Sequence, residues 1–203
     1  MHNIIRKAVR DFCLEYVEHP YLSYTEHGQH ALFFQRLYKL IPPSKRHFLW
    51  NGNRACIIQK ECPTASNLGK PTRQHWDIAV IKIPPKSTED RHSFDYFKLD
   101  GVVEFGMNEA YDHLQDDVER MSHPDSNLDY GIAVHFHRLS KPGGFISGRD
   151  WSPKSKRIVN KDDLLEMVVN LPIEIWYAMS DSTKSYENGV WRINTSGIEK
   201  VEK

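Results

Sequence analysis

The stretches Trp76-Asp77-Ile78-Ala79-Val80-Ile81 and Gly101-Val102-Val103-Glu104-Phe105-Gly106 decide how the chain folds. Each is a short apolar run that contains one acidic residue. Runs of this kind are typical of strands that are covered on both faces of a sheet. Carboxylates are seldom buried without a partner or a metal ion. We therefore expect Asp77 and Glu104 inside a covered sheet, and a divalent cation is the simplest group that would hold them together.

Helices are expected before these strands. The apolar stripe from Ile4 to Tyr16 predicts a first helix that ends at His19-Pro20. Ser23-Tyr24-Thr25-Glu26 has the form of a capping box, which predicts a second helix that begins at Ser23 and stops at Pro42-Pro43. Glu26 then opens the buried stripe of this helix.

The remaining elements complete an α/β pattern. Residues 54–60 read as a strand, and with the Asp77 and Glu104 strands they suggest a meander. Residues 108–121 predict an amphipathic helix that packs Ala110, Leu114 and Val118 on the sheet and turns its acidic residues outward. A strand at 130–137, a helix capped by Asn160 and a strand at 173–177 follow. We expect one domain over residues 1–203, with a mixed central β-sheet flanked by helices.

Composition narrows the function classes. The 203 residues are 39% hydrophobic, and no apolar run approaches the roughly 18 residues that span a bilayer. The N-terminus lacks the apolar segment of a signal peptide, so we expect a soluble, cytoplasmic protein with no membrane partner. Its three cysteines have no C-x-x-C spacing and predict reduced thiols. Lys plus Arg and Asp plus Glu both number 27, so nucleic-acid binding would need a local basic patch, and the densest cluster is Lys154, Lys156 and Arg157.

A helix with Glu26, a strand with Asp77, a strand with Glu104 and a following amphipathic helix resemble the PD-(D/E)XK nuclease superfamily. The resemblance covers roughly residues 23–138, with the helix and strands of about 139–203 after it, and implies a restriction endonuclease-like core. It also implies that Asp77 and Glu104 ligate Mg²⁺ or Mn²⁺, with the Phe105 carbonyl as a third ligand, and that Glu26 is the acidic residue of the first core helix. Such a cation would activate water and neutralise charge on a phosphate.

The motif lysine of that family is missing, because its position is Gly106. Glycine can neither orient a water molecule nor contact a phosphate. Lys98, in phase with Glu104, and Gln115, on the next helix, are the substitutes that the sequence offers. The chain is therefore either a metal-dependent nuclease or a non-catalytic interaction or nucleic-acid-binding module on the same fold.

Several residues also have a structural interpretation. Glu26 would serve as the third helical residue of the capping box, and Asp77 would pair with Arg73 or Arg54. Glu61 and Asp100 lie at strand ends and are secondary ligand candidates. His135 and His137 form an H-x-H pair on one strand face, which is either a zinc or iron site of a different metalloprotein or a solvated polar face.

Overall fold

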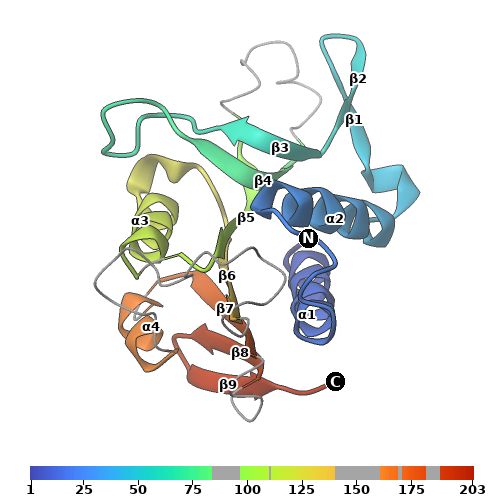
Figure 1. The fold of residues 1–203 in the computed structure, drawn as a ribbon. Coiled ribbons are helices and arrows are strands. Elements are labelled where there is room, and N and C mark those ends of the chain that lie inside the picture. The colour runs from blue at the N-terminus through green and yellow to red at the C-terminus, as the bar shows by residue number, and fades with distance from the viewer. Residues whose placement is uncertain (84–96, 110, 140–160, 169–170, 182–187) are drawn as a thin grey trace.

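The structure is a computed structural model that describes residues 1–83, 97–109, 111–139, 161–168, 171–181 and 188–203. Within them, seven strands form one sheet in the order β3-β4-β5-β6-β7-β8-β9. Helices α1 and α2 cover one face of this sheet, and α3 and α4 cover the other (Figure 1). The helices are α1 (His2–Glu18), α2 (Glu26–Leu40), α3 (Tyr111–Ser122) and α4 (Lys161–Val168), and the strands are β3 (Ile58–Pro63), β4 (His75–Ile81), β5 (Leu99–Met107), β6 (Gly131–Leu139), β7 (Ile173–Asp181), β8 (Gly189–Asn194) and β9 (Gly197–Val201).

The sheet is mixed, as the sequence predicts. Strands β3, β4 and β5 form an antiparallel meander, β5, β6 and β7 are parallel, and β7, β8 and β9 are antiparallel. The parallel strands lie in the middle and are covered on both faces, which explains their nearly continuous apolar sequences. The strands of the C-terminal part therefore extend the same sheet as the predicted core.

An aromatic cluster joins the sheet to α1 and α2. The Phe33 ring centroid lies 5.6 Å from that of Phe12 and 5.1 Å from that of Phe105, and the Phe105 centroid lies 6.0 Å from that of Phe136. All four side chains are buried. Because Phe105 directly follows Glu104 on β5, this packing fixes the strand that carries one of the predicted ligands.

Three local predictions need correction. The strand expected at 54–60 is two strands. Strands β1 (His47–Trp50) and β2 (Asn53–Cys56) form a separate hairpin, and the chain leaves it at Ile57 to enter β3. The second helix begins at Glu26 and not at Ser23, since Thr25 is its N-cap and accepts a hydrogen bond from the Gly28 N–H at 3.0 Å.

The third correction concerns α3. Leu114 and Val118 are buried and Asp112 and Glu119 are exposed, as expected, but Asp117 is also buried at 2% exposure. Ala110 and the basic cluster Lys154, Lys156 and Arg157 lie outside the described residues. Short 3-10 turns at Pro43–Lys45 and Pro124–Ser126 complete the described elements.

Candidate acidic site between strands β4 and β5

Asp77 and Glu104 meet where the β4–β5 ladder ends. The last paired residues at this end are Ile78 and Val103. Beyond them, Asp77 Oδ2 accepts a hydrogen bond from the Phe105 N–H at 2.8 Å, and Glu104 Oε1 accepts one from the Asp77 N–H at 3.3 Å. The two carboxylates thus satisfy backbone donors that the strand pairing leaves free. The sequence correctly placed both residues on adjacent strands.

The two carboxylates take their other partners from opposite faces of the sheet. Glu104 Oε2 accepts a hydrogen bond from Arg120 Nη2 on α3 at 3.2 Å. Asp77 Oδ2 lies 3.6 Å from His30 Nε2 on α2. The Asp77 side chain is 19% exposed, whereas that of Glu104 is 4% exposed. Asp77 is therefore the carboxylate that water or a ligand reaches first.

Arg120 neutralises part of the buried acid. Its guanidinium bridges Glu104 and Asp117 and lies 5.5 Å from the centroid of the Trp76 ring. Neither Asp117 nor Arg120 was singled out from the sequence. A buried ion pair of this kind stabilises the fold only relative to the unpaired charges, because each ion has lost its hydration.

Glu26 approaches the same region from the first turn of α2. As the first residue of the helix it does not make the reciprocal bond of a capping box, so that structural role is excluded. Instead its carboxylate accepts a hydrogen bond from the backbone N–H of Met107, at the end of β5. Burial, and then the charge of Asp77, raise the pKa of Glu26 to about 7.

The pKa values of the other acids shift in the same direction. Burial raises the pKa of Asp77 to about 6, although the Phe105 N–H opposes the shift and Asp117 adds to it. Burial, followed by Asp77 and Asp117, raises the pKa of Glu104 well above 4.5. Arg120 therefore does not balance all of the negative charge that these acids can carry. Their carboxylate oxygens form a donor set that suits a hard divalent cation.

The predicted ligands are close but do not form one cage. Among the described residues, Glu26, Asp77 and Glu104 are not a group whose ligand atoms all lie within 4.8 Å of one another. Phe105 reaches the site through its N–H, which it donates to Asp77. The donor chemistry fits Mg²⁺ or Mn²⁺, but the side chains of this conformation would have to move together to hold it.

The two substitutes for the motif lysine lie elsewhere. Lys98 pairs with Asp129 at 2.8 Å, just before the opposite end of β5, and six residues of strand separate it from Glu104 by about 20 Å. Gln115 is exposed on α3 and donates to Glu119 at 2.9 Å. A side chain built at Gly106 would meet Glu109 and His113 at 3.5 Å, an ordinary contact distance. Position 106 therefore tolerates a Cβ atom.

The remaining predicted residues are the acids near strand ends and the histidine pair on β6. Asp100 is half-buried at the start of β5, and Glu61 lies on β3, across from Asp77. Arg54 contacts His47, and Arg73 donates a hydrogen bond to the Thr64 carbonyl. His135 and His137 are both buried, so the solvated-face interpretation is wrong. The His135 ring stacks on Tyr177 at 5.5 Å, and burial lowers the pKa of His135 to about 3.

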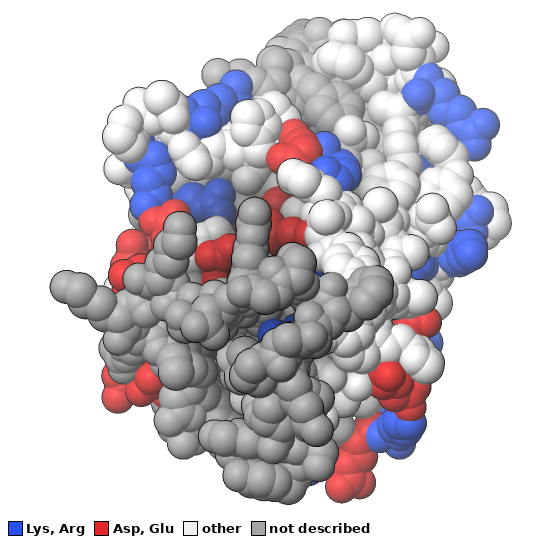
Figure 2. Space-filling model, viewed as in Figure 1, with Lys and Arg blue, Asp and Glu red and all other residues white. Residues whose placement is uncertain are grey.

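The surface around the acidic site carries both signs of charge. Figure 2 shows acidic side chains gathered over α3 and toward the sheet edge, with basic side chains above them on the β3–β4 connection. Lys70 on that connection pairs with Asp116 of α3. In the part of the chain that the structure describes, no helix has the length and apolar character needed to cross a membrane.

Comparisons of this chain with protein-family models, curated proteins and solved structures gave no match.

Proposed function

We propose that the chain is a metal-dependent phosphodiesterase of PD-(D/E)XK type that acts on nucleic acid. The observation that supports this most is the meeting of Asp77 and Glu104 at the open end of the β4–β5 ladder, with Glu26 beside them. Burial, with a smaller contribution from neighbouring acids, raises the pKa values of all three. Clusters of perturbed acids in a partly accessible position are typical of functional sites.

The residues of the site have separable roles in this proposal. Asp77, the more exposed acid, and Glu26 would hold Mg²⁺ or Mn²⁺ from either side, and Glu104 would complete the oxygen set if Arg120 turned toward Asp117 alone. The cation would supply a water molecule of lowered pKa and neutralise charge on the phosphate. Lys60, on β3, and Lys70 and Arg73, on the β3–β4 connection, would supply positive charge to a phosphate backbone.

A second function is favoured by two specific observations. Glu104 already has a cationic partner in Arg120, and no lysine stands at Gly106. Both features would suit a non-catalytic module that binds nucleic acid or another partner on the same fold. The two proposals differ in one measurable property, which is cleavage.

A cleavage assay separates the two functions. The full chain would be incubated with labelled single-stranded DNA, double-stranded DNA and RNA, in millimolar Mg²⁺, millimolar Mn²⁺ or chelator. We expect cleavage that requires the cation and that Asp77→Asn abolishes. Glu174→Gln is the matched control and should leave cleavage intact. Glu174 is a buried carboxylate of β7 that pairs with Arg6 and Arg192.

Restoring the motif lysine sharpens this test. Gly106→Lys puts an amine at the family's lysine position, where a Cβ meets Glu109 and His113 only at 3.5 Å, so it should increase the rate of cleavage. Binding of nucleic acid without cleavage in both the wild type and Gly106→Lys would favour the binding module. Absence of Mg²⁺ and Mn²⁺ binding in calorimetry at millimolar concentration would overturn the proposed cation site.

A further inference from the structure

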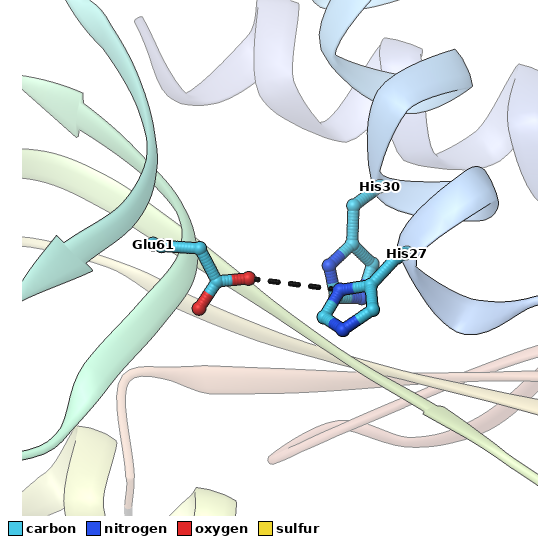
Figure 3. Close-up of side chains that lie close together, drawn as sticks. All are labelled: His27, His30 and Glu61. Atoms are coloured by element: carbon cyan, nitrogen blue, oxygen red, sulfur yellow. Dashed lines mark ion pairs between the residues drawn. The ribbon is translucent and has the colours of Figure 1, made fainter.

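Two histidines of α2 face a glutamate of β3. His27 and His30 are three residues apart and therefore lie on neighbouring positions of one helix face. Glu61 extends from β3 toward them (Figure 3), and its Oε1 lies 3.8 Å from His27 Nδ1. One ligand atom from each of the three residues lies within 4.8 Å of the others. A tetrahedral ion with bonds of about 2.0–2.1 Å keeps its ligand atoms about 3.4 Å apart, so small side-chain rotations would close this group around one ion.

His30 is the strongest sign that this group has a ligand. Its side chain is 1% exposed, and neither ring nitrogen has a hydrogen-bond partner among the described residues. Buried polar atoms are nearly always hydrogen-bonded, so an imidazole with two unused nitrogens needs an explanation. The ring is packed against Phe105 at 5.1 Å between centroids. The packing holds the ring in place while one of its nitrogens lies within the group.

The fourth donor is already adjacent. Asp77 Oδ2 lies 3.6 Å from His30 Nε2, too far for a hydrogen bond but within the separation of two ligands on one ion. Glu61 lies across from Asp77, because the neighbouring register pairs are Lys60 with Ile78 and Cys62 with Trp76. Glu61 also has a left-handed backbone (φ 52°), which is costly for a residue other than glycine. Backbone strain of this kind persists where the surrounding structure requires the geometry.

We propose that His27, His30 and Glu61 form a binding site for a borderline transition-metal ion of the Zn²⁺ class, with Asp77 as the adjoining donor. Imidazole nitrogens distinguish this site from the oxygen-only set of Glu26, Asp77 and Glu104. Nitrogen ligands favour Zn²⁺, Co²⁺ or Ni²⁺, whereas Mg²⁺ and Ca²⁺ prefer oxygen. The proposal does not depend on cleavage of nucleic acid, although both sites share Asp77.

One contact competes with the metal. Lys60 Nζ lies 2.9 Å from Glu61 Oε1, the same oxygen that faces His27. The Lys60 side chain is 33% exposed, so it can turn into solvent when an ion takes its place. Removing the amine should therefore strengthen metal binding, which a role of Glu61 in a purely structural ion pair would not predict.

The test is binding of the metal alone to the full, chelator-treated chain. Calorimetry with Zn²⁺ and absorption spectroscopy with Co²⁺ should show one ion per chain, not displaced by excess Mg²⁺. His27→Gln and Glu61→Gln change exposed side chains and should each weaken binding by about tenfold or more. Lys60→Met should strengthen it, and His19→Gln, at an exposed histidine of the α1 end, should leave it unchanged.

The outcomes are distinct from those of the phosphodiesterase proposal. Glu104→Gln should abolish Mg²⁺-dependent cleavage and leave Zn²⁺ binding intact, because Glu104 is not part of the histidine group. No Zn²⁺ or Co²⁺ binding at 1:1 stoichiometry, or binding that neither His27→Gln nor Glu61→Gln weakens, would overturn the metal site.

Discussion

Replacing Asp77 by asparagine should stabilise the metal-free protein at pH 8. The pKa of Asp77 rises from 3.8 to about 6 on folding, so ionising it in the folded state costs free energy. A shift of one pKa unit corresponds to about 1.4 kcal/mol, and the side chain remains 19% exposed. We therefore expect Asp77→Asn to raise the free energy of unfolding by about 1–3 kcal/mol. The asparagine oxygen can still accept the hydrogen bond from Phe105.

The effect has a defined pH window. Because the folded-state pKa of Asp77 is raised, its protonated form favours folding below about pH 4, and this advantage is lost as the pH rises through about 6. Asp77→Asn lacks this titration. The difference in stability between the variant and the wild type should therefore be near zero at pH 4 and reach its full value by about pH 7.5.

Urea denaturation in chelator at several pH values measures this difference, with Glu174→Gln as the control of opposite sign. Burial favours the neutral form of Glu174, but hydrogen bonds from Arg192, Tyr130 and Arg6 outweigh it and lower the pKa of Glu174. Its contribution to stability is thus present above its unfolded pKa and lost as the pH falls through the folded value. Glu174→Gln should destabilise the protein at pH 8 by about 3 kcal/mol, and less in acid.

We expect ionised Asp77 to destabilise the folded protein. This expectation would be refuted if Asp77→Asn were no more stable than the wild type at pH 8 and the difference between them did not change between pH 4 and 8. Asp77 would then be held as an ion by partners that compensate its charge, and the acidic site would have no unmet demand for a cation.

Three further predictions concern buried residues of α1 and α3. Arg120→Met leaves Glu104 and Asp117 buried without their cation and should lower the free energy of unfolding by about 3–5 kcal/mol at pH 8. The loss should be smaller at pH 5, where the acids take up protons. An unchanged urea midpoint would show that Arg120 is not the compensating charge. Leu114→Ala empties a fully packed position between α3 and the sheet and should cost about 2–5 kcal/mol in the same denaturation assay, whereas a loss below about 0.5 kcal/mol would contradict the packing of α3. Burial raises the pKa of the Cys13 thiol, so iodoacetamide should alkylate Cys13 only after unfolding. Mass spectrometry of the labelled peptide measures this, and rapid labelling in the folded state would argue against the burial of Cys13.

The sequence predicted the sheet well because its signals are local. The apolar runs around Asp77 and Glu104 have the length and composition of covered strands, and adjacency in a meander follows from short connections. Glu26 was placed near the site but given the wrong helix position, since Ser23 and Thr25 are both good N-caps and only the hydrogen bond to Gly28 distinguishes them. The nuclease-like assignment of the core is still a prediction.

Asp117 and Arg120 were missed because their charge suggested exposure. Asp117 lies three residues after Leu114 and four before Met121, so its position in the helix already indicated burial, but its charge suggested exposure. Arg120, one turn later, supplies the compensation. His30 lies on the buried side of α2. Its proximity to Glu61 could not be predicted, because it depends on the register between β3 and β4 and on how α2 packs across them.

The packing of α1 on β7 has a consequence for synthesis of the chain. Arg6 and its partner Glu174 are 168 residues apart, and the apolar side of α1 packs on strands that are synthesised well after it. At about 5–20 residues per second, the helix waits about 10–30 s for its binding surface. During that interval Ile5, Val9 and Phe12 are exposed on the nascent chain. Helix α1 is thus made well before the strand on which it packs, and during that interval its apolar side is a surface that a chaperone can cover.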